Sequence, residues 1–111
     1  MTVRDKLSPM IQEKLARAHA EYGEKLGGRL DELTELIRRA RAEEDGALAR
    51  AQQLAHRLCG TAGSFGFKEV SDALAVVDRT LLALLEGAPA SDEAWGEVAA
   101  ATRRAAASVA K

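Results

Sequence analysis

One histidine of this sequence stands among residues that leave its ring accessible. His56 is followed within four positions by the run GTAGS, residues 60–64, in which every side chain is small or absent. A neutral imidazole carries a lone pair on one ring nitrogen, so an accessible one can act as a nucleophile. Glycine costs a helix interior about 1 kcal/mol relative to alanine, and access for a partner molecule would justify that loss. Glycine also marks helix ends, so Gly63 has a purely structural alternative.

Cys59, the only cysteine, shares a helix face with His56 because it follows three residues later. A zinc site would need further ligands, and the sequence offers only His19 and scattered acids. A thiol nucleophile would need a pocket and an oxyanion site, and no motif indicates either. We therefore expect no metal site, and we interpret Cys59 as a small apolar filler.

The elements that must position His56 are helices. Alanine, leucine, glutamate and arginine dominate, whereas β-branched and aromatic residues are few, so an all-α fold is expected. A helix start at Ser8-Pro9 and a last helix from about Asp92 to Val109 bound five helical segments. The segments are separated by breaks at residues 27–28, 43–46, 64–66 and 87–89. Short connections imply antiparallel neighbours, which predicts an up-down antiparallel four-helix bundle with an additional N-terminal helix, a single domain over residues 1–111.

The helix around His56 turns its apolar residues away from the histidine. At about 100° per residue, Ala51, Leu54 and Leu58 cluster on the opposite side, so His56 is expected to face solvent. A partner is expected to dock on the surface around the ring, formed by Ala49, Gln52, Gln53, Cys59, Gly60, Gly63, Ser64 and Phe65.

The run AHRLCGTAGSFGF, followed by KEVSDAL, closely resembles the histidine-containing phosphotransfer (HPt) domain family. The resemblance extends from about Tyr22 to the end of the last helix. It implies that His56 accepts a phosphoryl group through Nε2 from an aspartyl phosphate of a receiver domain and passes it to another receiver. Leu58 matches the family's core-facing leucine, and Gly60 matches the glycine that keeps the ring accessible.

The resemblance has one departure, because Cys59 stands where most members have a lysine that offers positive charge. Arg57 and Lys68 are candidates to supply that charge, and both extend the expected docking surface. Asp78, at the edge of the following helix, is a candidate acceptor for Nδ1–H of His56, which would leave Nε2 free. In resembling domains a polar residue at about this position often has that role. A solvated boundary aspartate is the structural alternative.

These features predict a phosphoryl carrier rather than an enzyme. The sequence has no glycine-rich phosphate loop and no room for a nucleotide-binding domain, and Mg²⁺ is expected from the partner receiver. The implied partners are response-regulator receiver domains and a hybrid or sensor histidine kinase, and a monomer is expected. The alternative is a non-catalytic docking module that binds a receiver or kinase without carrying phosphate, and the Cys59 departure keeps that alternative open.

Composition excludes other classes of function. The net charge is −1 and basic residues alternate with acidic ones, so the chain has no electrostatic footprint for nucleic acid. No apolar run approaches the roughly 20 residues that span a bilayer, and the N-terminus lacks the apolar core of a signal peptide. A lone cysteine fits a reducing compartment. We expect a cytoplasmic protein that binds no membrane.

Overall fold

The computed structural model describes residues 8–110, and these residues form four helices and no strand. The helices are α1 (Pro9–Arg41), α2 (Ala47–Ser64), α3 (Lys68–Leu85) and α4 (Asp92–Val109). Residues 1–7 and 111, which the sequence prediction includes in the domain, lie outside this range. Within it, no helix is both long enough and apolar enough to cross a membrane.

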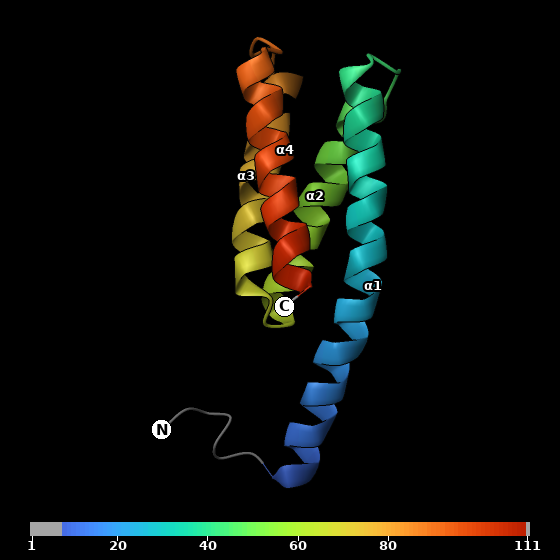
Figure 1. The fold of residues 1–111 in the computed structure, drawn as a ribbon, viewed down its shortest axis with the longest axis vertical. Helices are drawn as coiled ribbons and strands as arrows, with labels where there is room; N and C mark the ends of the chain where they lie inside the picture. Colours follow the sequence, from blue (N-terminus) through green and yellow to red (C-terminus); the bar gives the residue numbers. More distant parts are fainter. Residues whose placement is uncertain (1–7, 111) are drawn as a thin grey trace.

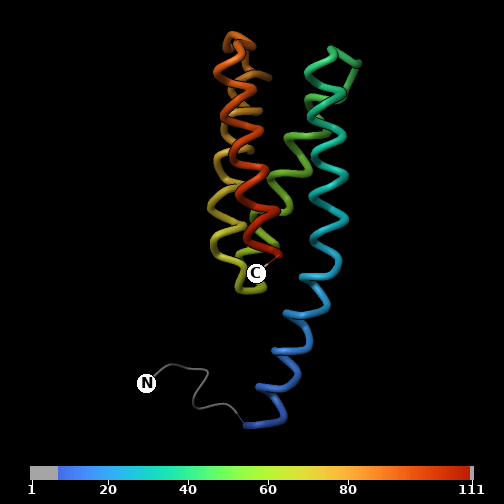
Figure 2. Tube along the Cα trace, viewed as in Figure 1, coloured from blue at the N-terminus to red at the C-terminus, as the bar shows by residue number. Residues whose placement is uncertain are grey.

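The four helices run alternately up and down, as Figure 1 shows. α2 packs between α1 and α3, and α4 packs against α3 and α1, so the helices form a closed ring around one core. The connections between them are short, as the trace in Figure 2 makes clear, and short connections place consecutive helices antiparallel. The predicted all-α bundle is confirmed.

Side-chain caps fix where two helices begin. Ser8 Oγ accepts a hydrogen bond from the backbone N–H of Ile11 at 3.2 Å, and Ser91 Oγ accepts one from Ala94 at 3.1 Å. These caps satisfy N–H groups that have no acceptor within the first turn of a helix. The turn into α3 contains Gly66 at a φ of 87°, a left-handed conformation that glycine adopts without strain.

The core fixes which part of α1 belongs to the bundle. Leu26 is the first buried residue of α1, and every described residue before it is half-buried or exposed. From Leu26 onwards, α1 belongs to a core that contains small side chains as well as large ones, since Ala101 and Ala105 of α4 are also fully buried. The bundle therefore begins near Leu26, and the N-terminal part of α1 extends beyond it (Figure 1).

The predicted separate N-terminal helix is wrong, because residues 9–41 form one continuous helix of 33 residues. Gly27 and Gly28 lie inside it, and apart from the neighbouring backbone of α1 itself no atom comes within 4 Å of the position a Cβ would take on either. Leu26 and Leu30 are buried on both sides of the glycines, and their packing outweighs a helix-propensity cost of about 1 kcal/mol per glycine. α1 is therefore about 50 Å long, against about 27 Å for each 18-residue helix beside it.

Candidate functional site

His56 lies near the middle of α2, and its side chain is 74% exposed. Its Nδ1 is 2.8 Å from Oδ2 of Asp78 on α3. A carboxylate only accepts hydrogen bonds, so Nδ1 carries the proton in this contact. In the neutral imidazole the lone pair is then on Nε2, the other nitrogen of a ring that is largely open to solvent.

Asp78 is held in one orientation because both of its carboxylate oxygens accept hydrogen bonds. Oδ2 faces Nδ1 of His56, while Oδ1 accepts a hydrogen bond of 2.8 Å from Nε2 of Gln52. The Asp78 side chain is only 17% exposed, which limits competition from water. Gln52 and His56 are one helical turn apart on α2, so the carboxylate spans one turn of the neighbouring helix.

The contact between Gln52 and Asp78 is absent from the sequence prediction, which places Gln52 on the docking surface. The available signal was its spacing, because Gln52 precedes His56 by four residues and shares its helix face. An acid on the next helix that reaches His56 is therefore also within reach of Gln52.

Cys59 and Gly63 continue the same edge of α2, and both face Ser71 of α3. Cys59 Sγ donates to the Ser71 carbonyl oxygen at 3.3 Å, and Ser71 Oγ donates to the Cys59 carbonyl oxygen at 2.8 Å. A Cβ on Gly63 would lie 3.2 Å from Ser71 Oγ, so its absence allows the two helices to approach closely. The thiol at the position of the usual lysine is half-buried and contacts α3.

The predicted docking surface thus divides into an α3-facing edge and an outward face. Gln53, Arg57 and Gly60 are exposed and belong to the outward face, while Ala49 is half-buried. Apart from the neighbouring backbone of α2 itself, no atom comes within 4 Å of the position that a Cβ would take on Gly60, so the space beside it is open. This outward face is the part of α2 that a second macromolecule can approach.

The remaining predicted docking residues lie at the end of the bundle, away from His56. Ser64 is eight residues further along α2, about 12 Å along the helix axis. Phe65 stacks on Tyr22 of α1, with ring centroids 4.6 Å apart. Lys68 begins α3, ten residues before Asp78 and about 15 Å away along that helix.

α3 adds two exposed leucines that the sequence prediction does not include. Leu82 and Leu85 are 42% and 41% exposed. They follow Asp78 by four and seven residues, so they lie on the same face of α3 as the carboxylate. In residues 8–110, no group of three or more His, Cys, Asp or Glu side chains is arranged to hold a metal ion.

The arrangement combines an accessible imidazole, a fixed acceptor on one ring nitrogen and open space one turn away. A comparison with models of protein families matches residues 13–108 to the Hpt domain, and this match extends over parts of all four helices. Comparisons with curated proteins and with solved structures found no match. The family match covers most of the sequence and contains His56, Gln52 and Asp78. The chain therefore belongs to the Hpt domain family.

Proposed function

We propose that this chain is a phosphoryl carrier of a two-component phosphorelay, with His56 as the phospho-acceptor. Hpt domains are phosphocarrier modules of two-component signalling and are not kinases. The hydrogen bond between Nδ1 and Asp78 carries the specific assignment, because in the neutral ring it places the lone pair on Nε2 of an exposed side chain. The proposal treats residues 1–111 as one module that acts in the cytoplasm.

In the proposed transfer, the Nε2 lone pair attacks the phosphorus of a receiver's aspartyl phosphate. The N–P bond forms while the bond from phosphorus to the aspartate oxygen breaks, and the receiver carboxylate leaves with the electron pair. The proton stays on Nδ1, where Asp78 accepts its hydrogen bond and balances the positive charge that develops on the ring. Transfer to a second receiver is the same step in reverse.

Charge on the transferring phosphoryl group must be neutralised, normally by a metal ion and cationic side chains. We expect the receiver to supply Mg²⁺. On this chain, Arg57 is exposed and adjacent to His56, whereas Lys68 is about 15 Å from Asp78 along α3. The proposal therefore assigns to Arg57 the charge that Cys59 does not provide.

The proposed docking surface for the receiver covers α2 and α3 on both sides of the reactive ring. Gln53 and Gly60 provide a low, open surface on α2. Leu82 of α3 provides exposed apolar area beside it, and apolar area at the centre of an interface contributes most to binding. A histidine kinase would use the same surface, because it must reach the same nitrogen.

The test is transfer of label from a panel of radiolabelled, aspartate-phosphorylated receiver domains to the protein and to H56Q and H19Q. The two histidines of the sequence make H19Q the matched control. We expect acid-labile, alkali-stable label on the parent and on H19Q, and none on H56Q. If no protein takes label while receivers still bind the parent and H56Q, the chain is a docking module and the carrier proposal is wrong.

A further inference from the structure

The N-terminal part of α1, residues Pro9–Tyr22, extends past the ends of the other three helices (Figures 1 and 2); we call it the α1 arm. It carries three large apolar side chains that are exposed: Met10 at 67%, Ile11 at 45% and Leu15 at 49%. Most of the stability of a helix in a protein comes from packing of its apolar face. The arm therefore has the composition of a helix with a partner.

The apolar residues of the α1 arm form a stripe with coiled-coil spacing. Ile11, Leu15, Ala18 and Tyr22 are separated by four, three and four residues, the spacing of a and d positions in a heptad. Tyr22 stacks on Phe65 at the end of the bundle, so the stripe continues the side of α1 that faces the other helices. N-terminal to Tyr22, this stripe has no second helix of residues 8–110 packed against it, whereas a coiled coil needs two helices.

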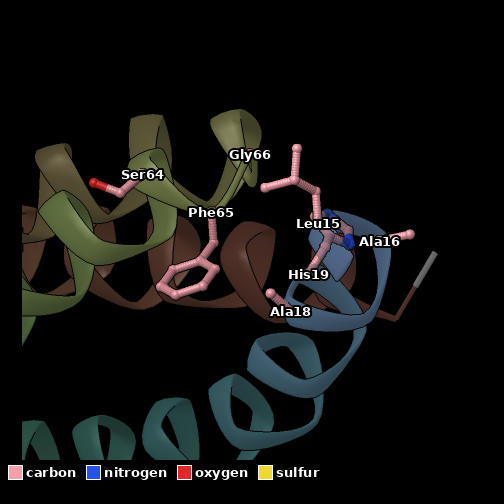
Figure 3. Close-up of a pocket in the computed structure, with 7 residues that line it drawn as sticks. All are labelled: Leu15, Ala16, Ala18, His19, Ser64, Phe65 and Gly66. Carbon is pink, nitrogen blue, oxygen red and sulfur yellow. The ribbon is translucent and has the colours of Figure 1, made fainter. Parts of the chain in front are cut away.

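An open groove lies between the α1 arm and the end of the bundle. Leu15, Ala18 and His19 line it from α1, and Phe65 and Gly66 line it from the turn between α2 and α3, as Figure 3 shows. His19 stacks on Phe67, and Phe65 is 39% exposed. The groove is thus walled by apolar and aromatic groups and is open where a second helix would lie.

We propose that the α1 arms of two copies of this chain pair as an antiparallel coiled coil, so that the protein is a dimer. In the symmetric register, Leu15 packs against Ala18 of the second copy, and Ile11 packs against Tyr22 of the second copy. Each layer pairs one a position with one d position, as antiparallel packing of this stripe requires. A dimer replaces the monomer expected from the sequence.

Charge complementarity favours a second copy as the occupant. Lys14 and Glu21 are seven residues apart and lie on the same edge of the stripe. The register that stacks the apolar layers places Lys14 opposite Glu21 of the second copy, and the two-fold axis repeats this pair. Both residues are exposed, and within residues 8–110 neither forms an ion pair.

The proposed dimer leaves both reactive histidines accessible. His56 lies on α2, nine residues before Phe65 in the turn that follows, and is therefore about 13 Å from the groove along the helix axis. The proposal is therefore independent of the phosphotransfer function, and either one can fail without the other.

The test is sedimentation velocity of the full chain across a concentration series from micromolar to millimolar. We expect a dimer at the upper end for the parent, and a monomer for L15E, whose circular dichroism should remain helical. An uncompensated charge in the apolar seam should raise the dissociation constant roughly a hundredfold or more.

Two charge reversals test the register. K14E and E21K should each raise the dissociation constant about tenfold, because each turns two attractive pairs into repulsive ones. An equimolar mixture of the two variants should dimerise like the parent, since every pair across the seam again joins an acid and a base. E24K is the matched control, because Glu24 lies on the outer face of α1 and its reversal should change nothing.

A parent that stays monomeric throughout the series overturns the proposal. So does a dimer that L15E leaves intact, because the association then uses another surface. A mixture of K14E and E21K no tighter than either variant alone overturns the antiparallel register. Retention of another cellular protein by a monomeric parent, abolished by L15E, would assign the groove to that protein instead.

Discussion

At the scale of single residues, the carboxylate of Asp78 serves two donors at once, and this fixes the reactive ring. Gln52 holds one oxygen and thereby orients the other toward Nδ1 of His56. Because all three side chains come from the facing edges of α2 and α3, the packing of these helices sets the tautomer. Asp78 is a positioning residue in the proposed reaction, since it contacts the imidazole and not the phosphoryl group.

Replacing Asp78 by alanine should slow phosphoryl transfer to His56 about tenfold. A hydrogen bond to a charged group contributes about 1.5–3 kcal/mol, and loss of about 1.36 kcal/mol at the transition state is enough for a factor of about ten in rate. The ¹⁵N chemical shifts of the ring should show a smaller fraction of the Nδ1–H tautomer in D78A. D72N is the control, because Asp72 is an exposed acid of α3 with no hydrogen bond to His56. An altered tautomer with an unchanged rate would show that orientation of the ring does not limit transfer.

At the scale of elements, α2 contains two glycines in opposite environments. Gly60 borders open space, whereas Gly63 faces Ser71, whose hydroxyl is fixed by its hydrogen bond to the Cys59 carbonyl. A methyl group therefore has room at the first position and a tight contact at the second. Alanine would fit at position 60 and would stabilise the helix, so packing does not explain the glycine. This supports its proposed role in access to His56.

We expect G60A to be more stable than the parent by up to about 1 kcal/mol, or roughly 4–8 °C in Tm for a domain of this size. G63A should be less stable than G60A, because Ser71 must shift by a few tenths of an ångström and strain its hydrogen bond. Thermal unfolding followed by circular dichroism measures both. If G60A also transfers phosphoryl groups as fast as the parent, its proposed role in access is wrong.

The contact between α1 and the turn from α2 to α3 is aromatic. Tyr22 stacks on Phe65, and His19 stacks on Phe67 with ring centroids 4.1 Å apart. Burial raises the pKa of the Tyr22 phenol above its usual value of 10.0, and Arg29 offsets part of that rise. Its hydroxyl is buried and has no hydrogen-bond partner among residues 8–110.

The midpoint of the phenolate absorbance of the folded protein should lie above pH 10.0, and F65A should shift it back toward that value. Stability should be independent of this group well below pH 10. It should fall as the pH rises toward the folded-state pKa, because the unfolded chain loses the proton first. Y22F is the control, since it removes the only tyrosine and must abolish the signal. A midpoint at or below 10 would contradict the burial of the phenol.

Much of the element scale is predictable from sequence, because caps and periodicity act locally. Ser8 and Ser91 mark helix starts, and the predicted last helix from Asp92 to Val109 matches α4. The break at residues 27–28 is wrong because glycine propensity is a weak local effect that buried leucines on both sides override. The approach of Asp78 to His56 is predictable in outline. The inward orientation of Cys59 is not, because a helix alone does not show on which side its neighbour lies.

At the scale of the whole molecule, the packing of α1 against the core is uneven along its length. Leu26, Leu30 and Leu33 are buried, whereas the α1 arm has no buried residue. Elements with few buried contacts open locally at a lower free energy than the core. One continuous helix is therefore expected to have two different local stabilities.

Amide hydrogen exchange should divide α1 near Leu26. In dilute protein, the amides of the α1 arm should exchange at least about tenfold faster than those of residues 30–40, because local opening there exposes no fully buried residue. At concentrations that favour the proposed dimer, protection of the arm should increase while that of residues 30–40 stays constant. Uniform protection along α1 in dilute protein would contradict this division.

The two ends of the bundle also differ in their chromophores. Trp95, the only tryptophan, is buried where α4 begins, beside the connection from α1 to α2. Tyr22, the only tyrosine, lies at the opposite end, beside the turn from α2 to α3. The chain thus contains one native optical reporter for each end, with the proposed phospho-acceptor His56 between them. A signalling event that leaves both emissions unchanged is confined to the middle of the bundle, and one that changes a single emission identifies the end to which it travels.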